Sequence, residues 1–216
     1  MARIGVFTMD FKFYHDVIQL LKQWQLPFVS LESPENVPPD VSVILSSSRD
    51  EVSLTNQIKS EKPEDALRKS LCTFVSKDSF ESLVIGIDPG PYPGVAVFAD
   101  NILTEAYECP VLDKLGAEIH SIINSYMYKD LEIKVGNGDA PNRDNIIKTL
   151  KDLHLKITVV DEKNTSFPHK IHDNALSAAR IAQIDKMYRI SENVISNQRR
   201  RTAYEREFTT LKSIIS

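Results

Sequence analysis

The stretch Leu83-Val-Ile-Gly-Ile-Asp88 decides the fold of the longer part of the chain. It is an apolar run that ends in a carboxylate, and this pattern is typical of a buried strand. The turn Pro89-Gly-Pro-Tyr-Pro-Gly94 follows it, and Val95-Ala-Val-Phe98 returns as the second strand of a hairpin. A third strand is expected from Ile102 to Tyr107. This part of the chain is therefore expected to begin as a three-stranded meander.

Helices and strands are expected to alternate after the meander. Apolar spacing predicts helices over 117–128, 142–152 and 173–189, and strands over 132–135 and 157–160. Three meander strands followed by alternating helices and strands predict a mixed sheet with helices packed against it, which is an α/β fold.

Upstream, residues 1–78 are expected to form a separate small α/β domain. Strands are predicted over 3–8, 28–31 and 41–45, with a helix over 14–25 and another that starts at Pro63. This domain contains one glycine, so it has no glycine-rich phosphate loop, and we expect it to serve dimerisation or substrate positioning.

The remaining domain limits follow from polarity and charge. The polar residues 76–82 interrupt the apolar pattern, so the second domain is expected over 79–190. Residues 191–216 hold five basic and three acidic side chains and are expected to form a basic C-terminal helix. Residues 81–190 hold 12 basic and 16 acidic side chains, so the acidic excess lies in the segment with the candidate site.

The overall composition is that of an ordinary soluble protein. The 216 residues are 42% hydrophobic and carry a net charge of −4, which excludes a strongly basic coat for non-specific nucleic-acid binding. No apolar run approaches the ~18–20 residues of a membrane-spanning helix, and the first residues lack the apolar region of a signal peptide. The spacing of Cys72 and Cys109 suits neither a zinc knuckle nor a disulfide framework. We therefore expect a cytoplasmic protein with no membrane partner.

Three acids stand where a sheet of this kind can bring them together. Asp88 ends the first strand of the meander, Glu162 follows the strand that ends at Val160, and Asp173 lies in the first turn of the last helix. Crowded carboxylates repel one another, and a divalent cation relieves that repulsion. Mg²⁺ or Mn²⁺ takes hard oxygen ligands and can assist phosphodiester hydrolysis. Taken singly, the three acids also suit a turn, a solvated surface and a helix N-terminus, in that order.

The motifs around these acids resemble a known family. Ile85-Gly-Ile-Asp-Pro-Gly90, followed by Gly94-Val-Ala-Val97, is similar to the first-strand signature of RuvC-type Holliday-junction resolvases and their YqgF-like relatives, within the ribonuclease H-like superfamily. Val159–Ser166 resembles the YqgF-type DERxTT segment, with Lys163 in place of the arginine. Residues 172–182 resemble the closing helix of both groups, and the whole resemblance covers about residues 82–190.

The resemblance implies metal-dependent endonucleolytic hydrolysis of structured nucleic acid, either DNA of the Holliday-junction type or structured RNA. Asp88, Glu162 and Asp173 would be the catalytic residues and would bind Mg²⁺ or Mn²⁺. The glutamate that RuvC-type resolvases carry at the end of the fourth strand has no counterpart, so Asp139 or Asn137 would have to replace it as a metal ligand. Asp139 is otherwise a loop acid or the N-cap of the next helix. This departure leaves open a catalytically degenerate ribonuclease H-like module that binds nucleic acid or protein.

Nucleic-acid contacts are expected around this site. Arginine can grip phosphate and tyrosine can stack on a base, and the C-terminal end offers four such side chains: Arg199, Arg200, Arg201 and Tyr204. The same residues also suit a charged helix face. By position, Tyr92 is expected to stack on an unpaired base and Lys163 to neutralise phosphate charge.

Two further expectations follow from the substrate and from the length. Symmetric cutting of a junction requires two active sites, so that substrate predicts a homodimer. An actin-like nucleotide binder opens with a similar strand–Asp–Gly hairpin, but about 130 residues remain after this motif, too few for its second lobe.

Overall fold

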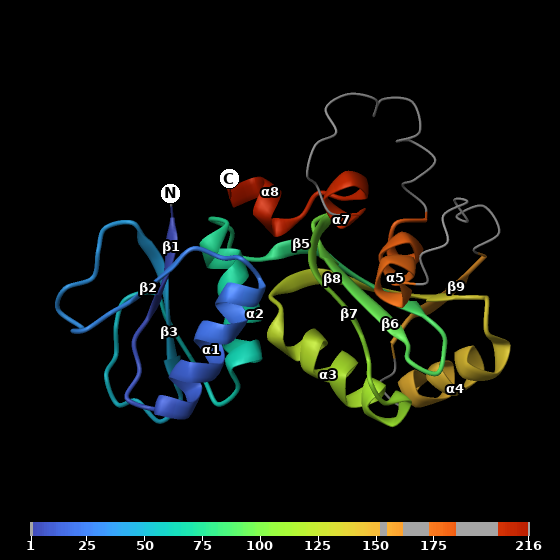
Figure 1. Ribbon diagram of the computed structural model, residues 1–216, viewed down its shortest axis with the longest axis horizontal. Coiled ribbons are helices and arrows are strands. Elements are labelled where there is room, and N and C mark those ends of the chain that lie inside the picture. The colour runs from blue at the N-terminus through green and yellow to red at the C-terminus, as the bar shows by residue number, and fades with distance from the viewer. Residues whose placement is uncertain (1, 152–154, 162–172, 185–202, 216) are drawn as a thin grey trace. The chain divides into compact units, whose positions relative to one another are not determined.

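The computed structural model describes residues 2–151, 155–161, 173–184 and 203–215 (Figure 1). They fold as two compact units. The first comprises Met1–Phe80, Ser121–Met127 and the last two residues, and the second comprises Glu81–His120 and Tyr128–Ile214. Both units contain strands and helices, so the predicted α/β class is confirmed. No helix within the described ranges has both the length and the apolar character to cross a bilayer.

The first unit is built on a four-stranded parallel sheet. Its strands lie in the order β2-β1-β3-β4, and each neighbouring pair is parallel. Its elements are β1 (Arg3–Val6), α1 (Phe11–Gln23), β2 (Phe28–Ser30), β3 (Val41–Ser47), β4 (Gln57–Ser60) and α2 (Pro63–Phe74). Strand β4 was missing from the sequence prediction, because Gln57-Ile-Lys-Ser60 has a single apolar residue and stays only half-buried beside β3.

Helix α1 shows how local sequence fixes an element of this unit. The Asp10 side chain accepts hydrogen bonds from the backbone N–H groups of Lys12 and Phe13, both at 3.1 Å, and so caps the helix. The helix therefore begins at Phe11, three residues before the predicted start. Its buried residues, at helical spacing, are Phe13, Val17 and Leu21.

The second unit is built on a five-stranded mixed sheet in the order β7-β6-β5-β8-β9. Its meander consists of β5 (Phe80–Asp88), β6 (Gly94–Ala99) and β7 (Ile102–Glu108), paired antiparallel. The later elements are the short 3₁₀ helix η1 (Leu112–Lys114), α3 (Leu115–Ser125, of which Ser121–Ser125 belongs to the first unit), β8 (Tyr128–Gly136), α4 (Ala140–Lys151), β9 (Ile157–Val160), α5 (Asn174–Ala182), α7 (Ala203–Glu207) and α8 (Leu211–Ile215). The predicted meander and the alternation of helices and strands after it are confirmed.

Three predictions for the second unit are wrong. Helix α3 ends at Ser125 rather than 128, and β8 begins at Tyr128 rather than 132. The described part of 191–216 holds two short helices, α7 and α8, in place of one basic helix. Helix α5 reaches its C-cap at Gln183, and the rest of the predicted helix, 185–189, lies outside the described part of the chain.

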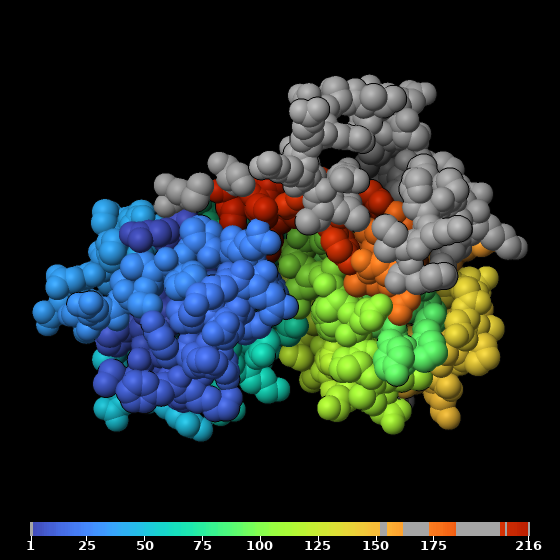
Figure 2. Space-filling view, in the orientation of Figure 1, coloured from blue at the N-terminus to red at the C-terminus, as the bar shows by residue number. Residues whose placement is uncertain are grey.

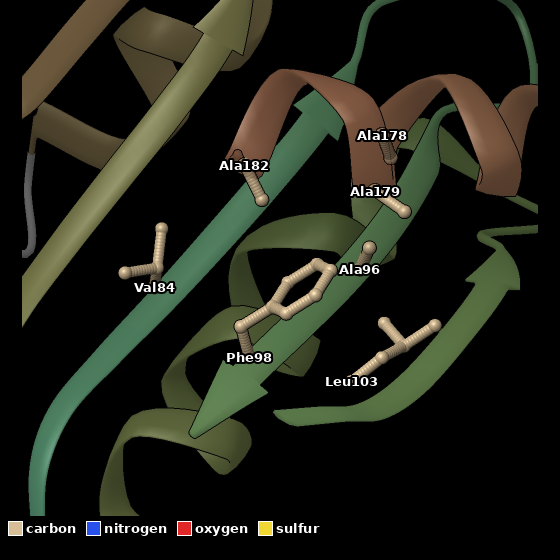
Figure 3. Packing of buried hydrophobic residues seen from close by; sticks show 7 residues of the cluster. All are labelled: Val84, Ala96, Phe98, Leu103, Ala178, Ala179 and Ala182. Atoms are coloured by element: carbon tan, nitrogen blue, oxygen red, sulfur yellow. The ribbon is translucent and has the colours of Figure 1, made fainter. Parts of the chain in front are cut away.

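The core beneath α5 is built from small side chains. Three alanines of α5, at positions 178, 179 and 182, point at the sheet and pack against residues of β5, β6 and β7 (Figure 3). Their partners in the cluster are Val84, Ala96, Phe98 and Leu103. Small residues on the helix and the sheet allow the two to approach closely, and this close approach positions the site described below.

Each unit contains one buried cysteine without a disulfide partner. Cys72 lies in α2 and Cys109 directly follows β7. Burial raises the pKa of the Cys109 thiol above its usual value, so this side chain stays protonated at neutral pH.

Candidate active site at the edge of the second sheet

Helix α5 lies directly on β5 and β6 because two glycines leave room for its backbone. A Cβ atom placed on Gly94 would stand 1.9 Å from the carbonyl oxygen of Asn174, and one placed on Gly86 would stand 2.1 Å from that of Ala178. No side-chain carbon tolerates such distances to backbone atoms, so only glycine fits at either position. The first turn of α5 is thus held against the first residue of β6.

This packing brings Asp88 and Asp173 to the same end of the sheet. Asp88 is the last residue of β5 and pairs in register with Gly94. Side chains alternate along a strand, so Asp88 faces the side of the sheet that Gly86 presents to α5. Asp173 precedes Asn174, whose backbone reaches Gly94. Both aspartates are half-buried there.

Strands β8 and β9 end at this same edge. The Phe80 N–H donates to the Met127 carbonyl at 2.8 Å, so β5 and β8 begin side by side and run in the same direction. β9 pairs with β8 in parallel, with Val160 opposite Gly136. Asp161 therefore follows β9 at the edge where Asp88 ends β5. Such an edge, where parallel strands terminate, is where open α/β sheets commonly bind ligands.

The third predicted ligand, Glu162, lies outside the described residues, as does Lys163. In the part of the chain that the structure describes, no three His, Cys, Asp or Glu side chains form a group able to hold a metal ion. The three-acid site thus stays a prediction, with Asp88 and Asp173 as its described members.

The Asp173 carboxylate is already engaged by donors of the protein itself. It is the N-cap of α5 and accepts a 2.9 Å hydrogen bond from the Leu176 N–H at Oδ1. The Tyr204 hydroxyl lies 3.1 Å from Oδ1 and 3.3 Å from Oδ2. Burial, followed by the negative charge of Asp173, raises the pKa of Tyr204 far above its usual value, so the hydroxyl keeps its proton and acts as a donor.

Asp139 takes the helix-capping role, one of the alternatives to metal binding. Its Oδ1 accepts from the Asn142 N–H at 3.2 Å and its Oδ2 accepts from the Asn142 side-chain amide at 2.8 Å, at the start of α4. Arg143 donates to the side-chain oxygen of Asn137 and forms an ion pair with Asp144. The end of β8 therefore uses its polar groups to begin α4.

The predicted nucleic-acid contacts have different outcomes. Tyr92 is 59% exposed in the turn after Asp88, and its carbonyl accepts from the Asn174 side-chain amide at 3.0 Å, so base stacking by its ring stays a prediction. Arg199, Arg200 and Arg201 lie outside the described residues. Tyr204 is half-buried against the α5 core and its hydroxyl contacts Asp173, and base stacking by its ring stays a prediction.

Sequence reasoning missed a polar cluster at the corresponding edge of the first sheet. The buried carboxylate of Asp50 accepts from the N–H groups of Met9 and Ser47, at 2.8 and 2.9 Å, and the Lys59 ammonium donates to its carbonyl at 2.6 Å. The Asp10 carboxylate accepts from the Ser47 hydroxyl at 3.2 Å. The available signal was an aspartate a few residues after each of two strands, β1 and β3. These contacts fasten the two loops to each other.

The comparisons with known proteins concern mainly this first unit. A family model described as a response regulator receiver-like domain matches residues 3–74, one third of the chain. The parallel sheet of that segment is what the match covers. The resemblance of residues 82–190 to RuvC-type and YqgF-like proteins lies outside the matched range and stays a prediction.

Two other comparisons add little. No curated protein matches the chain. A solved structure of Marinitoga piezophila Argonaute in complex with a 5′-OH guide RNA is similar at 12% identity and a TM-score of 0.28. The similarity covers 74% of this chain and 39% of that chain, and at such a score it carries no argument about either fold or activity.

Proposed function

We propose that the second unit is a ribonuclease H-like, RuvC/YqgF-like domain that hydrolyses phosphodiester bonds of structured nucleic acid with the help of Mg²⁺ or Mn²⁺. One observation carries the proposal. Gly94 lets the first turn of α5 touch the strand that pairs with the end of β5, so Asp88 and Asp173 share one edge of the sheet. The strand order, with the meander on one side of β5 and parallel β8 and β9 on the other, also supports it.

The donor set at this edge suits a hard divalent cation. Asp88 and Asp173 offer carboxylate oxygens, which Mg²⁺ and Mn²⁺ prefer, and Glu162 would complete the set. A cation bound there would lower the pKa of a water molecule and neutralise charge on the phosphate. Asp88, half-buried beside the α5 N-terminus, and Asp173 would hold the cation. The capping bond from Leu176 fixes the orientation of Asp173.

The substrate class follows from chemistry near the edge and from the family resemblance. Tyr92 presents an exposed ring two residues before the glycine that α5 covers. Lys163 and the arginines 199–201 would supply charge to phosphates on either side. Holliday-junction-type DNA or structured RNA is the proposed substrate, and a junction substrate requires a homodimer.

Cleavage assays on junction, duplex and structured RNA substrates test this proposal. Wild type is expected to cut one of them in the presence of Mg²⁺ or Mn²⁺. Asp88→Asn is expected to lose that activity because the proposed metal site loses one negatively charged ligand. Asp130→Asn is the matched control, since Asp130 is exposed near the opposite end of β8 and should cut like wild type. Cleavage by Asp88→Asn at the wild-type rate would show that the proposed site is not the active site.

A second candidate is a non-catalytic module that binds structured nucleic acid. It is favoured by the Asp173 carboxylate being occupied by Tyr204 and Leu176, and by the use of Asp139 as a helix cap. Such a module would bind without divalent cations, and its affinity would fall steeply with salt. Binding measured with a chelator present, with Asp88→Asn equal to wild type and no cleavage by either, would favour this candidate over hydrolysis.

A further inference from the structure

The C-terminal segment Ala203–Thr210 is fastened to the second unit by several contacts. Glu207 forms a two-point ion pair with Arg180 of α5, at 2.8 and 2.6 Å. The Phe208 ring meets the Phe98 ring of β6 edge-on, with centroids 5.4 Å apart. Figure 2 shows the same segment, in red, against the orange atoms of α5. The segment therefore packs on α5 and on β6 beneath it.

The segment also covers the outer edge of the sheet. The Leu103 N–H of β7, which is the last strand on that side, donates to the Thr209 carbonyl at 2.8 Å, and Leu103 forms a parallel bridge with Thr210. An edge strand without such cover exposes a row of backbone groups. The segment thus has a defined backbone register on the unit as well as side-chain contacts.

Within this segment, Tyr204 is the residue that reaches the proposed metal ligand. Its hydroxyl stands at nearly equal distances, 3.1 and 3.3 Å, from the two oxygens of Asp173. An atom so placed lies close to the bisector of the carboxylate, where a cation held by both oxygens would sit. The Leu176 N–H also binds Oδ1, so this oxygen already has two donors, while Oδ2 has the shared Tyr204 hydroxyl.

We propose that Ala203–Thr210 is an internal inhibitory segment, in which the Tyr204 hydroxyl occupies the cation position of Asp173 until the segment leaves the α5 surface. This inference rests on the proposed metal site at Asp88 and Asp173 and adds its regulation. A cation held by both Asp173 oxygens would displace the hydroxyl. The segment then loses its contact to Asp173 and depends on its other contacts, which include the ion pair to Arg180, the ring contact to Phe98 and the backbone bond to Leu103.

Mn²⁺ titration of the full chain tests the inference. Tyr204→Phe removes the hydroxyl and keeps the ring, so it is expected to bind Mn²⁺ about ten-fold more tightly than wild type, the worth of a hydrogen bond to a charged group. Glu207→Gln weakens the anchor at Arg180 and is expected to shift affinity in the same direction by less. The matched control, Tyr14→Phe, removes a tyrosine hydroxyl that bonds Ser30 in the first unit and should bind like wild type.

Hydrogen exchange supplies a second readout. Saturating Mn²⁺ is expected to accelerate exchange of the Leu103 amide in wild type and to leave it unchanged in Asp88→Asn. Equal or weaker Mn²⁺ binding by Tyr204→Phe, with exchange of Leu103 unaffected by the ion, would overturn the inhibitory role while the metal site stands. If neither wild type nor Tyr204→Phe binds Mn²⁺ through Asp88, both the site and its inhibition fail. Tighter binding by Tyr204→Phe without cleavage of any substrate would keep the inhibitory role and remove the hydrolytic function.

Discussion

Substituting Gly94 by alanine is the sharpest test of the geometry behind the site. The new Cβ would stand 1.9 Å from the carbonyl oxygen of Asn174 and 2.3 Å from its carbonyl carbon. Both are backbone atoms, so no side-chain rotation relieves the clash, and the first turn of α5 must lift from β6. Asp173 would move with that turn, away from Asp88.

The expected cost follows from the packing. Overfilling a tight site destabilises proteins by about 1–3 kcal/mol, and a clash with backbone falls at the upper end of that range. The free energy of unfolding of a small domain falls by about 2 kcal/mol per molar of urea, so a loss of about 3 kcal/mol should lower the urea midpoint of the second unit by roughly 1.5 M. Gly90→Ala is the matched control, because its Cβ would meet nothing closer than the Tyr92 carbonyl oxygen at 4.0 Å. Its stability should change by less than about 1 kcal/mol.

Urea unfolding followed by far-ultraviolet circular dichroism measures this loss. Trp24, the single tryptophan, lies in the first unit, so its fluorescence should report a transition that Gly94→Ala leaves in place. Mn²⁺ affinity should fall in Gly94→Ala and stay at the wild-type value in Gly90→Ala. Equal stability of the two alanine variants would refute the contact between α5 and β6, and with it the convergence of Asp88 and Asp173.

Three further predictions concern single carboxylates. Asp50→Ala should lower the free energy of unfolding of the first unit, followed by Trp24 fluorescence in urea, by about 2–3 kcal/mol, because two backbone N–H groups lose their buried acceptor. Glu51→Ala changes an exposed neighbour and should have little effect. The hydrogen bond from the Phe13 N–H is the main cause that lowers the pKa of Asp10, so its contribution to stability is present above the usual aspartate pKa of about 4 and is lost as the pH falls through the lower folded value. Trp24-monitored unfolding across that acidic range should therefore show a smaller loss in Asp10→Asn than in wild type, and equal losses would contradict the assignment. Asp139→Ala should destabilise α4 by about 1 kcal/mol, seen as faster amide exchange in its first turn, whereas Asp139→Asn keeps the cap. Neither variant should change Mn²⁺ affinity. A loss of affinity in Asp139→Asn would show that Asp139 is a metal ligand.

Periodicity located most elements because their apolar residues are buried. The runs at 83–87 and 95–98 are continuous and buried, and the structure places both in strands as expected. The ends were less accessible to this reasoning. β3 continues through Ser46 and Ser47, which are buried polar residues satisfied by tertiary hydrogen bonds, and an apolar-run criterion stops before them at Leu45.

The sequence likewise predicted some parts of the candidate site and not others. Asp88 and Asp173 were found because each stands at the end of a recognisable element, and the topology then brings these ends together. The Tyr204 contact could not be found, since it joins residues 31 positions apart and depends on a segment whose sequence indicates only charge. The two glycines carried a signal that was used only as a motif, although their physical role is to admit the backbone of α5.

The two buried thiols can report how often each unit opens. Cys72 and Cys109 lie in different units, and each is shielded from solvent. An alkylating reagent reaches either sulfur only when the surrounding unit opens, so the labelling rate of each cysteine measures how often that unit opens. Mass spectrometry of the two cysteine peptides from one labelled sample would therefore show which unit opens more often, without a denaturant, a dye or an added mutation.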